Sequence, residues 1–596
     1  MTFTTRPEIA GTFGIATSTH WIASAVGMGL LEKGGNAFDA AVSMGFVLNV
    51  VEPHLNGPLG DLPALIQPAG DDMPTVICGQ GTAPAGATIA HYRSEGLELI
   101  PGSGLLATVI PGAFDAWMLM LRDHGSMTVR DVLEPAIHYA RAGHPLLQRV
   151  ADTIDGQAEF FRTEWPTSYD TWVPGGQIPQ AGALFCNPAL ADTWSRILDE
   201  AEQVEGREAQ IDAARNAFYK GFVAEAIDSY LRDACVMDAT GERRKGVLTG
   251  QDMASWQASY DAPLSVDYHG WTVYKPGIWT QGPTLLQGLQ TLSNFDLASM
   301  DMQGADFIHT VAETLKLIFA DREAYYGDPT DTDIPTEILL SADYAATRAA
   351  LISDTASHEQ RPGRIAGHEH WADAAIARAA SNYVVPDGIG LGEPTMAHLR
   401  EKRGDTVHLD VIDRWGNMVT ATPSGGWLQS SPVVPGLGMV LNSRAQMFWL
   451  DEGLPTSLTP GRRPRTTLSP SMARRPDGGH LCMGTPGGDQ QDQWQLIYLL
   501  RLIHGGMELQ QAMDTPLFHS THFQSSFYPH DVQPGHLTVE PGFGEAIIAD
   551  LRSRGHIVDV PEPWSVGRLT SASRDPNGML HGSASARLMQ AYAIGR

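Results

Sequence analysis

The sequence predicts an α+β protein with an α-rich front part and a mixed α/β back part. In the front part apolar residues recur at helical spacing, and in the back part they alternate as they do in strands. The expected helices lie at 23–51 (two helices around a Gly34-Gly35-Asn36 break), 113–122, 131–142 and 304–327. Between the two parts, residues 350–400 are polar and weakly periodic, which predicts a long connection.

The back part is predicted to open with a hairpin. Residues 406–412 alternate in character, the dipeptide Gly416-Asn417 supplies a turn, and residues 418–422 form the returning strand. Short strands at 438–442 and 480–484 and a helix near 491–503 are expected to follow.

Length and composition exclude several classes of protein. At 596 residues the chain is longer than a single core supports, and 43% hydrophobic with 18% charged residues is typical of a globular protein. The net charge of −28 argues against nucleic acid or an anionic membrane as a partner. The first residues lack the apolar core of a secretory signal, and no stretch approaches the ~20 apolar residues of a membrane span. We therefore expect a cytoplasmic protein.

The most informative segment is residues 404–419, which begins Gly404-Asp405-Thr406. A threonine at the start of a strand is common and means little alone. Its neighbours resemble the self-cleavage site of the γ-glutamyltranspeptidase family: Thr-x-His, a hydrophobic strand, an aspartate and a Gly-Asn turn. In this sequence the matching residues are Thr406, His408, Asp413, Gly416 and Asn417.

The resemblance is collinear over most of the chain, although each match is weak alone. The matching segments are 29–41, 51–57, 111–112, 135–143, 218–221, 248–252, 320–322, 327–329, 466–470 and 484–488. It implies the four-layer αββα sandwich of N-terminal-nucleophile hydrolases. It also implies self-cleavage between Asp405 and Thr406 into a large subunit, 1–405, and a small subunit, 406–596, which stay together as a heterodimer. No cofactor is implied, and the resemblance leaves open whether two heterodimers associate.

The chemistry that the resemblance implies needs these residue types. Thr406 is the implied nucleophile, and cleavage gives it a free α-amino group whose pKa of about 7.7–8.0 suits a base near neutrality. Gly487 and Gly488 match the pair whose N–H groups stabilise the oxyanion. Thr422 falls where the family has a threonine that supports the nucleophile's hydroxyl during self-cleavage, and a purely structural, buried strand threonine is an equal alternative.

The substrate clamp of true γ-glutamyltranspeptidases is missing. Gln80 stands at the position of the arginine that holds the substrate carboxylate, and Met447 at the position of the carboxylate that holds its ammonium group. Glutamine cannot replace an arginine–carboxylate fork, and methionine cannot pair an ammonium group. The remaining clamp positions also differ: they hold Gly81, Gly426, Arg444, Thr466 and Thr467.

The altered stretches, 79–84, 404–407 and 487–491, resemble a second branch of the superfamily, to which oxamate amidohydrolase belongs and cephalosporin acylases are related. In this branch Asp489 is expected to line the pocket, and Arg444 is the candidate for a substrate anion. A self-processed amidase acting on a small amide that is not a standard γ-glutamyl compound is the favoured hypothesis. A γ-glutamyl hydrolase or transferase with a rebuilt clamp and an uncleaved, non-catalytic homologue are the alternatives.

No metal site is predicted. The histidine pairs His368/His370 and His519/His522 lack the i, i+4 spacing of a helical zinc motif and are expected to be solvated. The four cysteines lie far apart and are expected to be reduced thiols.

Overall fold

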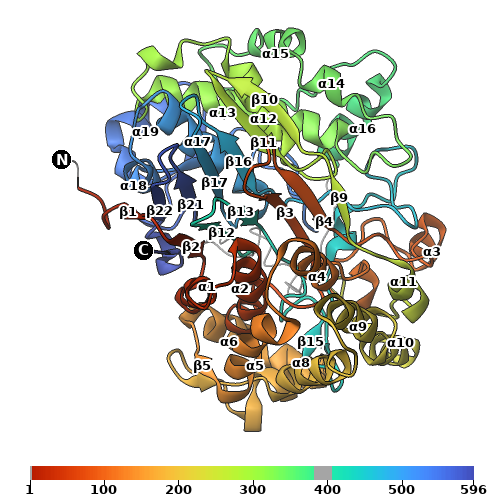
Figure 1. Cartoon of the computed structure of the whole chain (residues 1–596). Helices are drawn as coiled ribbons and strands as arrows, with labels where there is room; N and C mark the ends of the chain where they lie inside the picture. Colours follow the sequence, from red (N-terminus) through yellow and green to blue (C-terminus); the bar gives the residue numbers. More distant parts are fainter. Residues whose placement is uncertain (1–2, 382–405) are drawn as a thin grey trace.

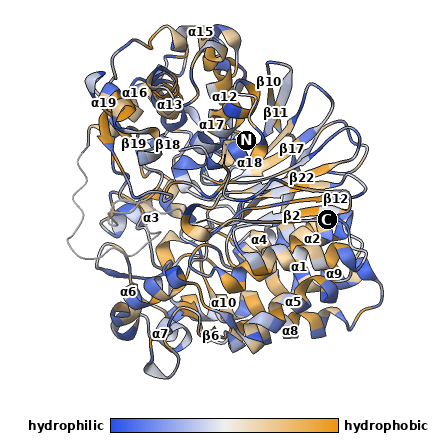
Figure 2. Ribbon diagram, turned by 90° about the vertical axis from the view of Figure 1, so that its left-hand side faces the viewer, coloured by the Kyte–Doolittle hydropathy of each residue, from blue (hydrophilic) through white to orange (hydrophobic). Residues whose placement is uncertain are grey.

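Two seven-stranded antiparallel sheets lie face to face at the centre of the molecule, and helices cover both outer faces (Figures 1 and 2). The computed structural model describes residues 3–381 and 406–596. The four-layer αββα sandwich predicted from the sequence is confirmed.

The first sheet has the strand order β1-β22-β21-β17-β16-β11-β10. Its strands are β1 (Ile9–Gly11), β22 (Leu580–Ala584), β21 (Thr570–Arg574), β17 (His480–Gly484), β16 (Ser471–Arg474), β11 (Trp271–Lys275) and β10 (Leu264–Tyr268). The second sheet has the order β23-β2-β12-β13-β3-β4-β9. Its strands are β23 (Tyr592–Gly595), β2 (Gly14–Ser18), β12 (Leu409–Asp413), β13 (Met418–Ala421), β3 (Leu62–Gln67), β4 (Thr75–Gly79) and β9 (Ser259–Asp261).

Both sheets combine strands from the two sides of residue 406. In the first sheet β11, from the front part, pairs with β16, from the back part. In the second sheet β12 and β13 lie between β2 and β3, which come from the front part. The front part is therefore less purely helical than the sequence predicted. Strands such as β2, in which all five residues are buried, lie between layers and lack the alternation that marks a half-exposed strand.

The helices that cover the second sheet are α1 (Trp21–Glu32), α2 (Ala37–Val51) and α4 (Ala113–His124). Those that cover the first sheet are α12 (Pro283–Leu292), α17 (Gln491–Ile503) and α18 (Leu509–Asp514), and α13 (Ala305–Tyr325) packs against α12. Further helices are α3 (Ile89–Ser94), α5 (Val129–Ala142), α6 (Gln148–Glu164), α7 (Pro166–Trp172), α8 (Pro188–Ala201), α9 (Arg207–Tyr219), α10 (Phe222–Asp233), α11 (Gly250–Ser255), α14 (Thr336–Leu339), α15 (Ala342–Ala349), α16 (Glu369–Ala379) and α19 (Glu545–Ser553). Small sheets outside the sandwich contain β5 (His144–Pro145), β6 (Leu184–Phe185), β7 (Val236–Met237), β8 (Arg243–Arg244), β14 (Val433–Val434), β15 (Met439–Val440), β18 (Phe518–Ser520), β19 (His536–Val539) and β20 (Ile557–Asp559).

Most of the predicted elements are present. The expected helices correspond to α1, α2, α4, α5, α13 and α17, and β12, β13, β15 and β17 lie where strands were expected. The expected loose connection at 350–400 is wrong in part, because α16 lies within it and buries Trp371 and Ala375. Its part at 382–400 lies outside the described residues.

The space between the sheets is apolar over most of its area and polar at one end. Ile15, Leu65, Ile412, Met472 and Cys482 belong to the apolar part. At the polar end the buried carboxylate of Asp410 on β12 accepts hydrogen bonds from Thr17 of β2 and from Thr570 of β21 in the opposite sheet. This end of the sandwich is where Thr406 lies.

Within 3–381 and 406–596, no helix is long and apolar enough to cross a membrane, and no group of three or more potential ligands could hold a metal ion. The expectation that His519 and His522 are solvated is wrong. Both side chains are buried, and His522 accepts a hydrogen bond from the N–H of Gly535. Burial lowers the pKa of His522 to about 3, which keeps the ring neutral.

Candidate active site

Thr406 begins the second described segment and lies three residues before β12. Its side chain is buried, and Oγ1 lies 3.3 Å from Oγ of Ser424, in the loop after β13. Ser424 Oγ donates to the carbonyl of Leu55, also at 3.3 Å. The hydroxyl of Thr406 is therefore held beside a second hydroxyl, inside the protein.

The pairing of β12 with β13 determines which side chain reaches Thr406. Leu409 pairs with Ala421, so continuing this register places Thr422 opposite His408 and Ser424 opposite Thr406. The prediction that Thr422 supports the nucleophile is not what the geometry shows, because its hydroxyl lies 2.9 Å from Nδ1 of His408. Ser424, which the sequence interpretation missed, occupies the place beside Thr406.

His408 is held in one orientation by its neighbours. Nδ1 contacts Thr422, and Nε2 lies 2.9 Å from Oδ1 of Asp410, whose other oxygen accepts from Thr17 and Thr570. Gly484, at the end of β17, packs against the imidazole so closely that a Cβ atom there would lie 2.2 Å from Cε1 of His408. The close approach of Gly484 brings the segment that follows it, 485–488, to the same end of the sandwich as Thr406.

The glycine pair of that segment has the features of an oxyanion site. Gly487 and Gly488 are buried and have φ angles of 128° and 53°, which disfavour other residues. Their carbonyl oxygens accept from the main-chain N–H of Gln490 and the side chain of Gln281. Neither glycine N–H donates a hydrogen bond to another of the described residues.

Asp413, Gly416 and Asn417 have structural roles at the other end of the hairpin. The carboxylate of Asp413 accepts from the main chain of Asn417 and Trp415 and from the N–H of Ala37, the first residue of α2. Gly416 has a φ of 94° in the turn. These residues position β12 and α2, and they do not contact Thr406.

Arg444 and Met447 lie in a buried turn of 3₁₀ helix near Ser424. The Nε atom of Arg444 lies 3.0 Å from both carboxylate oxygens of Asp61, and its guanidinium group lies over the ring of Trp427. Asp61 also exchanges main-chain hydrogen bonds with Ser424. Burial raises the pKa of Asp61, whereas Arg444 and the hydroxyl of Thr466 act to lower it. Arg444, expected to meet a substrate anion, thus contacts a buried carboxyl group of the protein.

The other expected substrate residues differ in how fully their polar atoms are used. The side chain of Gln80 is buried and donates to the carbonyl of Gly81, but its Oε1 has no partner among the described residues. The hydroxyl of Thr467 likewise has none there, although it is fully buried. Buried polar atoms are normally paired, so these two are candidates for ligand contacts.

Asp489 is occupied by protein partners. Its oxygens accept from Arg322 at 2.5 Å and from the N–H and hydroxyl of Ser526. Burial would raise the pKa of Asp489, but the Arg322 guanidinium and the hydrogen bonds from Ser526 lower it overall. Asp489 therefore bonds to Arg322 and Ser526 next to the Gly487–Gly488 turn. Its carboxylate is already occupied and is not presented to a substrate. Asp405 lies outside the described residues.

Comparisons with known proteins agree with this arrangement. The sequence profile of the γ-glutamyltranspeptidase family (Gamma-glutamyltranspeptidase) matches residues 23–594. The chain belongs to the γ-glutamyltranspeptidase family. Members of this family are hydrolases and transferases, so the chain is an enzyme of this kind.

Two relatives of this family member show its breadth. It is 30% identical to the Glutathione hydrolase-like YwrD proenzyme of Bacillus subtilis, over 97% of this chain and 98% of the relative. It is 29% identical to the Oxamate amidohydrolase proenzyme of Klebsiella pneumoniae, over 97% of both chains. A solved structure, that of LmbA2991, is 51% identical and superposes with a TM-score of 0.92 over 100% of both chains.

Proposed function

We propose that this enzyme is a self-processing amidohydrolase that uses Thr406 as its nucleophile. The observation that carries the proposal is the position of the Thr406 hydroxyl. It lies buried beside Ser424, at the end of the sandwich where Gly484, shortly before the Gly487–Gly488 turn in the sequence, packs against His408. The names of the relatives support processing, because YwrD and oxamate amidohydrolase are both called proenzymes.

The proposed processing step cuts the Asp405–Thr406 peptide bond. The oxygen of the Thr406 hydroxyl attacks the carbonyl carbon of Asp405, and the C–N bond breaks to leave a free α-amine on Thr406. Water then hydrolyses the ester. The two products, 1–405 and 406–596, remain together because both sheets contain strands from each product.

In the proposed catalytic cycle the α-amine of Thr406 takes the proton of the hydroxyl as Oγ1 attacks an amide carbonyl. The N–H groups of Gly487 and Gly488 stabilise the resulting oxyanion. The same proton passes to the leaving amine, and water hydrolyses the acyl-enzyme to a carboxylic acid. Ser424 orients the nucleophile, and the His408–Asp410 pair fixes the strand that carries it.

The test combines intact mass with amino-terminal sequencing. The wild-type protein is expected to give two associated pieces, with Thr406 as the new terminus of the smaller one. Thr406→Ala is expected to stay uncut and inactive, whereas Thr406→Ser cuts slowly and keeps some turnover. An alanine variant that still cuts between 405 and 406 would show that another residue performs the attack.

A γ-glutamyl hydrolase or transferase with a rebuilt clamp is the alternative, which the name Glutathione hydrolase-like of one relative favours. Because Gln80 and Met447 cannot hold the carboxylate and ammonium groups of a glutamyl unit, we expect γ-glutamyl-p-nitroanilide to be a poor substrate. A loss of ~4 kcal/mol in transition-state binding corresponds to roughly a thousandfold in rate. The comparison is kcat/KM against oxamate, succinamate and glutaryl amides on one processed preparation. A clear advantage for the γ-glutamyl compound would establish the alternative. The cytoplasmic location stays a prediction.

A further inference from the structure

A glutamine from the front part of the chain, Gln281, contacts the turn that contains the oxyanion glycines. It lies in the loop between β11 and α12, and its side chain is fully buried. Nε2 of Gln281 donates to the carbonyl oxygen of Gly488 at 2.9 Å. The main chain of Gln281 is fixed as well, because its N–H donates to the carbonyl of Thr466 and its carbonyl accepts from the hydroxyl of Thr284. The amide group of Gln281 is thus held against the turn.

Arg322, on α13, determines which way this amide group points. Its Nη1 atom donates to Oε1 of Gln281 at 2.8 Å, and a guanidinium group can only donate. The amide oxygen therefore faces Arg322, and the amide nitrogen faces the carbonyl of Gly488. Arg322 is itself held by ion pairs with Glu323 and Asp489. A flipped amide would place its nitrogen against a donor and its oxygen against an acceptor, so the orientation is fixed.

The peptide groups before the two glycine N–H groups are also held by their carbonyl oxygens. In a trans peptide the carbonyl of one residue and the N–H of the next point in opposite directions. The carbonyl of Pro486 accepts from the hydroxyl of Thr485 at 2.8 Å, and that of Gly487 accepts from the N–H of Gln490 at 2.9 Å. The N–H groups of Gly487 and Gly488 therefore point away from these two donors.

Gln281 acts on the peptide group that follows Gly488. The carbonyl of Gly488 accepts from the N–H of Gln491 in the same short helix and from Gln281. Gly488 has a φ of 53° and no Cβ atom, so its own backbone restricts rotation less than that of any other residue. Rotation about the bonds of Gly488 is prevented only when the peptide groups on both sides are held. Gln281 holds the second of them from outside the turn.

We propose that Gln281 is a positioning residue for oxyanion stabilisation, which keeps the N–H of Gly488 directed at the oxyanion that forms during amide hydrolysis. The inference rests on the function proposed for Thr406. It gives residues 1–405 a part in the chemistry, although the nucleophile and both glycines belong to 406–596. Fixed donors stabilise a charge that exists only in the transition state, so losing Gln281 should lower kcat and leave KM nearly unchanged.

Gln281→Glu is the sharpest variant, because it keeps the shape of the side chain. One carboxylate oxygen still accepts from Arg322, whereas the other replaces the amide nitrogen and repels the carbonyl of Gly488. We expect kcat to fall by about 10- to 100-fold, less than for the loss of an oxyanion donor, because the N–H is turned and not removed. Gln281→Met removes the donor without adding a charge and is expected to lower kcat by about 3- to 10-fold.

The measurement is kcat and KM of processed enzyme, on whichever of oxamate, succinamate and the glutaryl amides the wild type hydrolyses fastest. Gln287→Met is the matched control. Gln287 is a buried glutamine on α12 that bonds to Asp321 and Tyr326 and does not contact the turn. This variant is expected to lower the Tm and to leave kcat unchanged. The inference is wrong if Gln281→Met keeps the wild-type kcat, or if Gln287→Met lowers kcat as much as Gln281→Met does.

A crystal structure of Gln281→Glu gives a readout that does not depend on turnover. The carbonyl of Gly488 is expected to turn away from residue 281, and a turn identical to that of the wild type would overturn the inference.

Thr406→Ala separates this inference from the function proposed for Thr406. If Thr406→Ala keeps its turnover while Gln281→Glu lowers kcat, the nucleophile is wrongly assigned and the role of Gln281 stands. If Thr406→Ala is inactive while both Gln281 variants keep the wild-type kcat, the role of Gln281 alone is wrong.

Discussion

Two buried glutamates, Glu323 and Glu52, differ in the groups that bond to them. Glu323 pairs with Arg322 at 2.8 Å and with Arg465 at 2.6 Å, and Arg322 also pairs with Asp489 at 2.5 Å. Glu52 instead accepts hydrogen bonds from the hydroxyl of Thr19 and the side-chain amide of Gln590.

The pKa values of the carboxyl groups reflect this difference. Burial opposes ionisation of Glu323, but Arg465 and Arg322 lower its pKa overall. Burial raises the pKa of Glu52 to about 7, because it outweighs the hydrogen bond from Thr19 and the more distant Arg568 and Arg149. A buried carboxyl group therefore stays ionised where guanidinium groups contact it directly.

The largest expected difference concerns stability. Arg322→Met removes the main partner of Asp489 and one of the two arginine partners of Glu323, and such a loss costs about 3–5 kcal/mol. Glu52→Gln replaces a carboxyl group that bonds to neutral side chains, so we expect a smaller loss of stability. Chemical denaturation of both variants against wild type measures the two changes. Equal losses would show that the two glutamates do not differ in this way.

Glu52 gives a pH-dependent test of this difference. Its folded pKa of about 7 lies above the usual 4.5, so the folded state binds the proton more tightly than the unfolded state does. The stability of the wild-type protein relative to Glu52→Gln should therefore fall as the pH rises from 4.5 to above 7. The fall amounts to about 3 kcal/mol, because each unit of pKa shift is worth about 1.4 kcal/mol.

The measurement is the free energy of unfolding of both proteins at pH 5 and pH 8. Thr19 and Gln590 bond to the carboxyl group, and Arg149 and Arg568 act on it at longer range. The expected pH dependence is therefore that of Glu52 and not of a second acid. If the difference between the two proteins is the same at both pH values, Glu52 is either ionised or protonated throughout. Burial would then not control the protonation of Glu52.

How well a part of this structure is predicted from the sequence depends on how far apart in the sequence its interacting residues lie. Helix α17 and strand β17 have the predicted bounds, because their patterns and end signals are local. Strand β2 was missed because it is buried on both faces. The choice of Thr422 over Ser424 depended on the register of one hairpin. Asp413 bonds to Asn417 across three intervening residues, and that register follows from turn geometry, which the Gly-Asn pair alone does not fix.

The partners of Glu52 could not be found from sequence patterns. Thr19 lies just before α1, and Gln590 lies near the end of the chain. No motif links these positions. They meet only because β2 pairs with β23.

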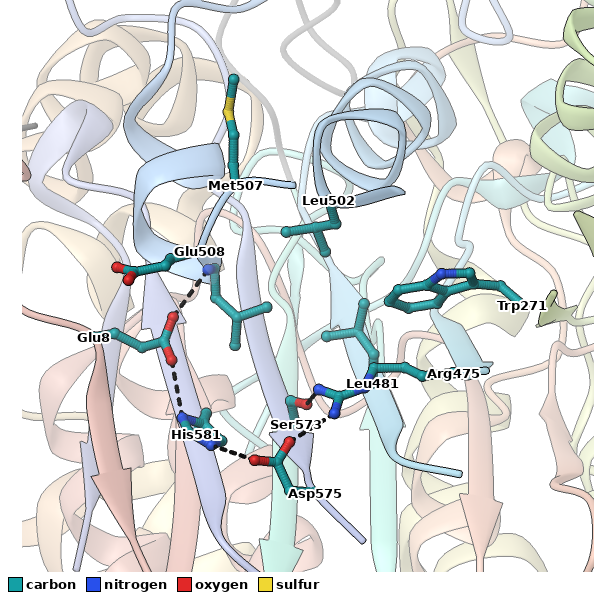
Figure 3. A pocket seen from close by; sticks show the side chains of 11 residues that line it. Glu8, Trp271, Arg475, Leu481, Leu502, Met507, Glu508, Ser573, Asp575 and His581 are labelled. Atoms are coloured by element: carbon teal, nitrogen blue, oxygen red, sulfur yellow. Dashed lines mark hydrogen bonds and ion pairs between the residues drawn. The ribbon is translucent and has the colours of Figure 1, made fainter. Parts of the chain in front are cut away.

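A third group of charged side chains, at the end of β17 and β21 away from Gly484, should show the smallest effect on stability. This group lines a pocket of about 380 Å³. Figure 3 shows that Glu8, His581, Asp575 and Arg475 form a chain of ion pairs there. Trp271 belongs to the apolar wall of the pocket. Leu481, which lines this pocket, lies roughly 10 Å along β17 from Gly484, at the strand rise of ~3.3 Å per residue.

His581 shows what solvent access changes. Its side chain is 23% exposed and lies between the carboxylates of Glu8 and Asp575, which are 22% and 26% exposed. Water reaches all three groups, so removing the imidazole leaves the carboxylates hydrated, whereas the carboxylate partners of Arg322 would stay buried without water.

His581→Asn is therefore expected to cost less than about 1 kcal/mol of stability. It should leave self-cleavage unchanged. Chemical denaturation measures the stability, and intact mass measures the cleavage. A cost as large as that of Arg322→Met would mean that burial does not set the energetic difference between these clusters.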